Sequence, residues 1–253
     1  MVHIVGAGPG DPELITVKGQ KFLSAADVVI YAGSLVNPEL LKFCKPDAEI
    51  YNSAEMMLDE IIHVIEKSDA QGKEIVRLHT GDPSIYGAIQ EQMDLLEEKN
   101  IDFDVVPGVS SFLAAAAALK QEYTLPGITQ SVIITRRGGR TPVSDKESLK
   151  KLAQHQTTLC IFLSIGLIQE VVRDLMSAGF KSSTPIAIVQ KASWPDEKII
   201  KGRLETIVEQ VKAEKIERTA MIIVGQCLNA RKEHYEKSQL YSPKFSHMFR
   251  SAK

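Results

Sequence analysis

Residues 75–90 constrain the fold of this chain more than any other part of its sequence. The segment begins with a short apolar run that is typical of a buried strand and continues into a sharp turn at residues 80–83. Asp82 before Pro83 then predicts a helix start, because Asp accepts a free backbone N–H and Pro fits the first helical position. The segment is either a structural turn or a ligand loop at the carboxyl end of a parallel strand.

The same alternation of strands and helices extends over the first half of the chain. Hydrophobic periodicity predicts strands at 2–5, 28–31, 49–51, 75–78 and 103–106, with helices at about 16–25, 57–65 and after residue 82. A short helix opens at Asn37, and the Ala-rich segment 110–119 predicts a helix buried on all sides. This pattern predicts a mostly parallel α/β domain over residues 1–117, followed by a linker over 118–130.

The second half of the chain predicts a mixed sheet. Strands are expected at 131–135, 158–163, 185–190, 198–201 and 220–224. Ser144 and Glu147 predict a capping box that starts a helix, and further helices are expected at 168–176, ending near Gly179, and at 204–211. A short loop around Trp194 joins two strands as a hairpin. The fold class is therefore two α/β domains, the second over residues 131–240, with an irregular tail over 241–253.

Composition excludes several classes of function. The chain has 253 residues, a formal net charge of −2 and a pI of about 6.3, which does not favour nucleic acid as a partner. Its three cysteines, Cys44, Cys160 and Cys227, are far apart, so neither a disulfide framework nor a metal site is expected. The apolar runs are too short to span a bilayer, and no basic leader precedes the first strand. We expect a cytoplasmic protein that binds no membrane.

The glycine-rich loop at residues 6–10 resembles a dinucleotide-binding loop only superficially. The Rossmann fingerprint requires G-x-G-x-x-G, whereas the third glycine here, Gly10, comes one residue early, after Pro9. An acidic residue for the ribose is also missing at the end of the second strand, where Tyr31 is followed by Ala32. An NAD(P) oxidoreductase is therefore an alternative that these residues disfavour.

Five motifs together resemble the tetrapyrrole (corrin/porphyrin) methylase family over nearly the whole chain, up to about residue 225. They lie in the family's order and spacing at residues 6–16, 23–31, 79–83, 106–110 and 219–225. The phrases at 31–38, 79–87 and 107–114 are most similar to members that methylate carbon C11 of precorrin-4 or its cobalt form. The resemblance therefore implies a methyltransferase of cobalamin (and more broadly porphyrin) biosynthesis.

The family resemblance also implies the cofactor and its site. It implies S-adenosyl-L-methionine held between the two domains, S-adenosyl-L-homocysteine as product, and a homodimer. The cofactor-contacting pattern transfers to Pro9, Gly81, Asp82, Ile85, Ser110, Ser111, Leu163, Ala192 and Ala220, and extends to Tyr86, Phe112 and Gln190. Because methyl transfer from a sulfonium to carbon needs no protein nucleophile, we expect no catalytic side chain and no metal.

The substrate implied by the resemblance is a small corrin precursor that carries many carboxylates. The first glycine loop, with Gly8, Gly10 and Asp11, is expected to face it. His79 is either a packed residue or a substrate contact. Three guanidinium groups on one loop could bind carboxylates or could form a solvated basic loop, and they belong to Arg136, Arg137 and Arg140.

One departure from the family favours a late corrin step. Members that methylate uroporphyrinogen III resemble this chain but carry Asp and Lys where it has Ala32 and Ser53. Three alternatives stay open: a different ring position, such as C17 or C20, a protein-methylating member of the same fold, and a tetrapyrrole-binding protein without catalytic activity.

Overall fold

The structure, a computed structural model, describes residues 1–230 and 235–252. They form two compact α/β units, each with one five-stranded sheet, which confirms the predicted fold class. The first unit comprises Met1–Ala115 together with Lys191–Glu197, and the second comprises the rest of the described chain. The division therefore falls inside the helix α4 (Ser111–Leu119). Within the described residues, no helix is long and apolar enough to cross a membrane.

The first sheet is entirely parallel. Its strand order is β3-β2-β4-β1-β5, where the strands are β1 (Val2–Gly6), β2 (Val28–Tyr31), β3 (Glu49–Asn52), β4 (Ile75–His79) and β5 (Phe103–Val106). Every residue of the adjacent strands β1 and β4 is buried, as expected for interior strands that are covered on both faces. Because parallel strands end at the same edge, the loops that follow β1, β4 and β5 lie side by side.

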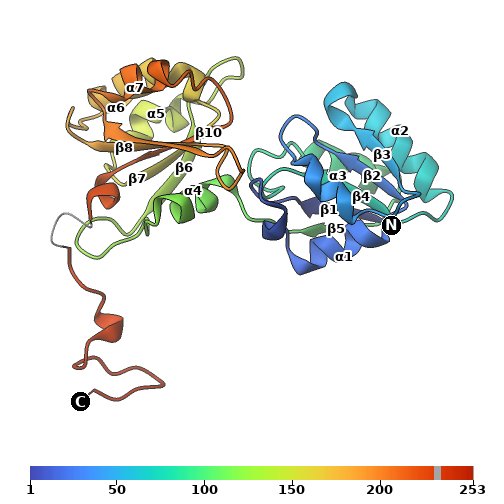
Figure 1. Cartoon of the computed structure of the whole chain (residues 1–253), viewed down its shortest axis with the longest axis horizontal. Coiled ribbons are helices and arrows are strands. Elements are labelled where there is room, and N and C mark those ends of the chain that lie inside the picture. Colours follow the sequence, from blue (N-terminus) through green and yellow to red (C-terminus); the bar gives the residue numbers. More distant parts are fainter. Residues whose placement is uncertain (231–234, 253) are drawn as a thin grey trace. The chain divides into compact units, whose positions relative to one another are not determined.

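Helices cover both faces of this first sheet (Figure 1). Alternate residues of each strand point to opposite faces, so that Ile75 and its neighbour Val76 belong to different cores. One core packs against α2 (Leu58–Asp69) and α3 (Gln90–Glu98). The other packs against α1 (Val17–Ala25) and the 3-10 turn Pro38–Phe43. The side chain of Thr16 caps α1 by accepting the Gly19 N–H at 3.1 Å.

The expected helix start at Asp82 is wrong, because α3 begins only at Gln90. The carboxylate of Asp82 instead accepts the N–H of Ser84 at 2.9 Å and the N–H of Gly108 at 2.9 Å. The backbone in between is not helical, and Tyr86 and Ala88 have positive φ angles of 55° and 49°. The turn therefore continues for several residues beyond the point that sequence periodicity indicated.

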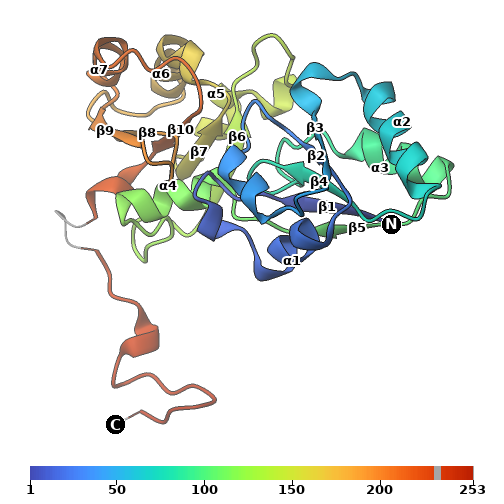
Figure 2. The same ribbon diagram turned by 45° about the vertical axis from the view of Figure 1, so that its right-hand side comes forward.

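The second sheet is mixed, as predicted. Its strand order is β6-β7-β10-β8-β9, where the strands are β6 (Val132–Arg136), β7 (Thr158–Phe162), β8 (Pro185–Gln190), β9 (Lys198–Arg203) and β10 (Ala220–Val224). Only the pair β6–β7 is parallel, and β8 and β9 form the expected antiparallel hairpin. Three helices lie along one face of the sheet (Figure 2): α5 (Leu149–Ala153), α6 (Ile168–Ser177) and α7 (Ile207–Ala213).

Two further expectations about helices need correction. Helix α5 starts at Leu149, and the hydroxyl of Ser144 bonds the side chain of Glu147 rather than a backbone N–H, so no capping box forms there. The helix α4 is not buried on all sides, since 49% of Leu113 is exposed. The predicted start of the irregular tail coincides with a short 3-10 turn, Gln239–Tyr241.

Candidate functional site

The loops after β1, β4 and β5 are tied together through their backbones. The N–H of Gly81 donates to the carbonyl of Gly8 at 2.8 Å, and the N–H of Gly8 donates to the carbonyl of Gly81 at 3.2 Å. The third loop joins them where the N–H of Gly108 donates to Asp82 Oδ2 at 2.9 Å. Three segments that are far apart in the sequence therefore form one assembly at the carboxyl edge of the first sheet, where parallel α/β sheets bind ligands.

Glycine is required where these loops cross. A Cβ on Gly6 would lie 2.6 Å from the Cα of Gly108 and 2.8 Å from the carbonyl oxygen of Gly81, which is closer than real Cβ contacts. A Cβ on Gly108 would overlap the same oxygen. Gly81 itself has a φ of 60°, in the left-handed region. The wall of this assembly therefore consists of closely packed peptide groups.

Asp82 links the second and third loops through both carboxylate oxygens. Oδ1 accepts the backbone N–H and the hydroxyl of Ser84, while Oδ2 accepts the N–H of Gly108. Partial burial acts to raise the pKa of Asp82, but the hydrogen bonds from Ser84 and Gly108 outweigh it and hold the pKa below its ordinary value. The ionised side chain of Asp82 therefore links the loop after β4 to the loop after β5 by hydrogen bonds.

A buried polar chain supports the irregular turn that follows Asp82. Arg77 Nε donates to Gln92 Oε1 at 2.9 Å, and Gln92 Nε2 donates to the carbonyl of Ala88 at 3.0 Å. Within this turn, Ile85 is half-buried and Tyr86 is exposed. These two predicted cofactor residues therefore lie on a turn whose backbone is held by the hydrogen bonds that link Arg77, Gln92 and the carbonyl of Ala88.

His79 lies at the end of β4, directly beneath the loop. It is only 4% exposed, and among the described residues its Nε2 atom has no hydrogen-bond partner. Burial, together with the nearby charge of Arg77, lowers the pKa of His79 to about 3, so the ring is neutral at pH 7. Burial also lowers the pKa of Arg77, to about 10, so this residue stays charged. A buried polar atom without a partner is the kind of group that a ligand or a water molecule satisfies.

The predicted serines lie next to this loop, at the start of α4. Ser110 is buried, and a Cβ on Gly81 would be in ordinary contact with its Cα at 3.6 Å. The carbonyl of Ser110 accepts the N–H groups of Leu113 and Ala114, which begins the helix. Ser111 and Phe112 occupy its first turn and are half-buried.

The segment Lys191–Glu197 brings Ala192 to the first glycine loop. The indole Nε1 of Trp194 donates to the carbonyl of Pro9 at 3.0 Å, and the hydroxyl of Ser193 accepts the N–H of Asp11 at 3.0 Å. Ala192 itself is buried. Family resemblance pointed to Ala192 but not to Trp194, although a lone tryptophan in a hairpin loop was a visible signal.

The predicted residues of the second unit also come together. Ala220 opens β10 and pairs with Gln190, the last residue of β8. Since Ile222 pairs with Ile161 on the antiparallel strand β7, Leu163 lies at the same end of the sheet. Leu163 is 68% exposed and has a positive φ of 52°, which is a strained conformation for leucine.

The arginine loop follows β6 at this same end, but two of its guanidinium groups have partners within the protein. Arg136 donates to the carbonyls of Thr141 and Pro142, at 3.1 and 2.9 Å. Arg137 Nε donates to Asp174 Oδ2 at 2.7 Å. Arg140 is exposed. The role of these three arginines in substrate binding stays a prediction. To bind a substrate carboxylate, Arg137 would have to share its guanidinium with Asp174 or give up that ion pair.

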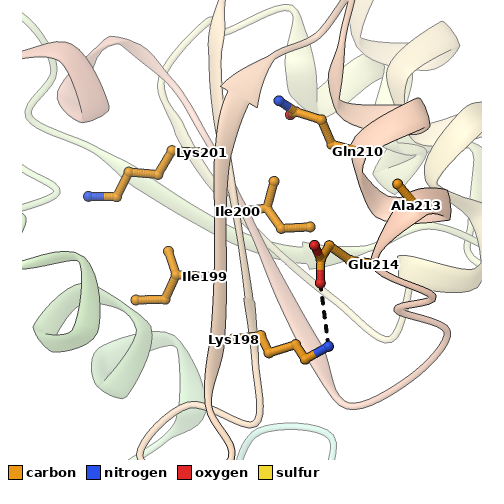
Figure 3. A pocket seen from close by; sticks show the side chains of 7 residues that line it. All are labelled: Lys198, Ile199, Ile200, Lys201, Gln210, Ala213 and Glu214. Atoms are coloured by element: carbon orange, nitrogen blue, oxygen red, sulfur yellow. Dashed lines mark hydrogen bonds and ion pairs between the residues drawn. The ribbon is translucent and has the colours of Figure 1, made fainter.

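The second unit also has a shallow hollow beside its edge strand β9, with a volume of about 520 Å³ (Figure 3). Ile200 and the salt bridge between Lys198 and Glu214 line it. None of its lining residues belongs to the predicted site.

Comparison with known proteins identifies the family. The family model described as "Tetrapyrrole (Corrin/Porphyrin) Methylases" matches residues 1–208. The cobalt-precorrin-4 C(11)-methyltransferase of Methanocaldococcus jannaschii is 57% identical over 251 residues, which are 99% of this chain and 96% of that protein.

Two solved structures are similar along most of their length. The X-ray structure of a cobalamin biosynthetic enzyme, cobalt precorrin-4 methyltransferase, has a TM-score of 0.88 and 47% identity, covering 90% of this chain and 95% of that one. The uroporphyrin-III C-methyl transferase of Thermus thermophilus, complexed with S-adenosyl homocysteine, has a TM-score of 0.73 and 29% identity. The match covers 90% of this chain and 93% of that one.

Proposed function

The chain belongs to the tetrapyrrole (corrin/porphyrin) methylases, and from this premise we propose that it transfers a methyl group from S-adenosyl-L-methionine to carbon C11 of cobalt-precorrin-4 in cobalamin biosynthesis. The observation that carries the proposal is the 57% identity, over 99% of this chain, to a relative named for that reaction. A solved structure with a TM-score of 0.88 is named for the same substrate and supports the choice of the cobalt form.

The residues of the first unit fit an S-adenosyl ligand. Glycines at the crossing let the loops after β1, β4 and β5 pack backbone against backbone at the carboxyl edge of the parallel sheet, which is where sheets of this kind bind ligands. Asp82 joins two of these loops through the N–H of Gly108, and the backbone of Ser110 lies beside Gly81. A related methyltransferase was solved with S-adenosyl homocysteine, which supports the same ligand here.

The chemistry of the proposed step requires orientation rather than a protein nucleophile. S-adenosyl-L-methionine supplies an electrophilic methyl group on a sulfonium. The chain has to hold that methyl in line with the ring carbon, and fixing two reactants in this way can contribute roughly 7–11 kcal/mol. The fixed turn at Ile85 and Tyr86 and the braced loop at Asp82 are suited to that task, because hydrogen bonds determine their backbone positions.

Calorimetric titration with S-adenosyl-L-homocysteine tests the cofactor part of the proposal. The wild type should bind, and Asp82→Ala should bind at least about tenfold more weakly, because the Gly108 N–H loses its charged acceptor. Ser84→Ala is the matched control, since it removes one hydroxyl bond to Asp82 and leaves the bond to Gly108. Failure of the wild type to bind would overturn the cofactor assignment.

A turnover assay tests the reaction itself. With S-adenosyl-L-methionine and cobalt-precorrin-4, the product should gain the mass of one methylene group per turnover, together with one equivalent of S-adenosyl-L-homocysteine. Uroporphyrinogen III serves as the control substrate and should not be methylated. Preference for metal-free precorrin-4 would correct the cobalt assignment, and methylation of neither precursor would contradict the proposed function.

The homodimer and the cytoplasmic location stay predictions of the same proposal. Sedimentation equilibrium of the purified protein checks the first, with twice the chain mass of 27.9 kDa as the expected result. A monomer at micromolar concentration would contradict it.

A further inference from the structure

We propose that Trp194 is a positioning residue which, with Ser193 and Asn37, fixes the first glycine loop in the conformation that accepts the tetrapyrrole. The inference rests on the proposed function, because it assigns a role in that reaction to Trp194 and Ser193, which lie outside the motifs of the family resemblance. Its evidence lies wholly within the first unit, to which the segment Lys191–Glu197 belongs.

Trp194 holds the loop by a hydrogen bond and by shape. Its indole Nε1 donates to the carbonyl of Pro9 at 3.0 Å, across 185 residues of sequence. The ring also fills the space beside Gly10, where a Cβ would overlap the indole atoms Cδ1 and Nε1. Gly10 is therefore a glycine because the tryptophan occupies the place of its side chain.

Two other side chains hold the next peptide group, between Gly10 and Asp11. The hydroxyl of Ser193 accepts the N–H of Asp11 at 3.0 Å. The buried amide of Asn37 donates to the carbonyl of Gly10 at 2.8 Å. Consecutive peptide groups from Pro9 to Asp11 are thus each bonded to a side chain from elsewhere in the sequence.

The segment that carries Trp194 is itself well fixed. The N–H of Ser193 donates to Glu197 Oε2 at 2.7 Å, and Lys191 forms an ion pair with Asp196. The ammonium of Lys191 also lies 5.7 Å from the centre of the Trp194 ring, within the range of a cation–π interaction. Backbone angles of 49° and 71° at Lys191 and Ser193 are costly and persist only where surrounding contacts determine them.

These contacts make the loop compatible with a polycarboxylate. A carbonyl oxygen carries partial negative charge, and an uncapped one repels an approaching carboxylate. Trp194 and Asn37 each donate a hydrogen bond to such an oxygen, at Pro9 and Gly10. Removing Trp194 uncaps the Pro9 oxygen and frees the loop, so the loss should appear mainly in substrate binding.

Steady-state kinetics of Trp194→Ala and Trp194→Phe tests this role. We expect the KM for cobalt-precorrin-4 to rise about tenfold in Trp194→Ala, and by less in Trp194→Phe, which keeps an aromatic ring but loses the indole N–H. The affinity for S-adenosyl-L-homocysteine should fall by a smaller factor than the KM rises. Trp194 bonds Pro9, one of the predicted cofactor residues, but the donors and acceptors at Gly81, Asp82 and Gly108 remain. An unchanged KM in a folded Trp194→Ala protein would overturn the inference.

A double-mutant cycle with Gly10 gives a test that general destabilisation cannot imitate. Gly10→Ala alone should raise the KM about tenfold, because its methyl group displaces the indole. In the Trp194→Ala background the same methyl occupies vacated space and should cost less than about twofold. An equal cost of Gly10→Ala in both backgrounds would show that the two residues act independently and would contradict the inference.

Different results would overturn the proposed function and the positioning role of Trp194. A wild type that neither binds S-adenosyl-L-homocysteine nor methylates a corrin precursor removes the proposed function. A wild type that does both, with variants of Trp194 that keep the wild-type KM, removes only the positioning role. Should Trp194→Ala fail to fold, Trp194→Phe and Ser193→Ala decide, since each deletes one hydrogen bond to the loop and removes less volume than Trp194→Ala.

Discussion

At the scale of single residues, His79 and Asp82 show how position in the fold sets chemistry. His79 is buried beside Arg77 and is neutral, whereas Asp82 is held ionised by the hydrogen bonds that it accepts. Neither state can be read from residue type. Both follow from neighbours that the fold supplies, namely the interior of β4 for the histidine and the N–H of Gly108 for the aspartate.

The buried, neutral state of His79 predicts that the protein loses stability in acid. Its pKa of about 3 in the folded protein lies below the ordinary value of 6.5, so the unfolded chain binds more protons between these values. The contribution of the neutral His79 to the free energy of unfolding should therefore be complete above pH 6.5. It should decrease as the pH falls below that value, by about 2 kcal/mol at pH 5. Chemical denaturation at pH 7 and pH 5 measures this loss.

Variants separate the contribution of His79 from those of other groups. His79→Gln should lose less stability than the wild type between the two pH values, by that same amount of about 2 kcal/mol. His63→Gln, on the exposed side of α2, is the control and should keep the wild-type dependence. Parallel curves for His79→Gln and the wild type would refute the buried neutral state.

At the scale of elements, the turn between β4 and α3 differs most from its sequence pattern. Apolar spacing after Asp82 predicted a helix, yet the helix begins at Gln90. The competing contacts are non-local, because the partner of Asp82 is Gly108, which is 26 residues further along the chain. Single-sequence periodicity contains no information about such a partner.

The left-handed backbone of this turn predicts a stabilising substitution. Ala88 is exposed and has a φ of 49°, a conformation that costs an L-residue roughly 1–2 kcal/mol and glycine much less. Ala88→Gly should therefore raise the free energy of unfolding by about 1 kcal/mol. Ala117→Gly, at an exposed helical position of α4, is the control and should lower it by about 1 kcal/mol. Destabilisation by both variants would contradict the strained turn.

The arginine loop after β6 predicts a graded effect on substrate binding. Arg140 is exposed, whereas Arg137 pairs with Asp174 on α6. If the loop binds substrate carboxylates, Arg140→Ala should raise the KM for the corrin precursor severalfold without lowering thermal stability. Arg137→Ala should also raise the KM, and it should lower thermal stability as well, because it removes the ion pair with Asp174. An unchanged KM for Arg140→Ala would leave the loop without a role in binding.

At the scale of the whole molecule, the sequence predicted the two sheets, their parallel and mixed character and the loops of the first unit. Continuous apolar strands and glycine turns are local signals, so these features could be read directly. The hydrogen bond from Trp194 to Pro9 could not be predicted from the sequence, because the two residues are 185 positions apart and no local pattern indicates the contact. The capping box expected at Ser144 is absent for a local reason, since the Ser144 hydroxyl bonds the side chain of Glu147 and not a backbone N–H.

The ring position of the transferred methyl group distinguishes the proposed reaction from methylation at any other carbon. S-adenosyl-L-methionine carrying a ¹³C-labelled methyl group, incubated with the enzyme and cobalt-precorrin-4, should give a product whose new carbon resonance correlates with C11 of the ring. The proposed function predicts this single labelled position. A label at any other ring carbon, or no labelled corrinoid from an enzyme that binds S-adenosyl-L-homocysteine, would contradict it.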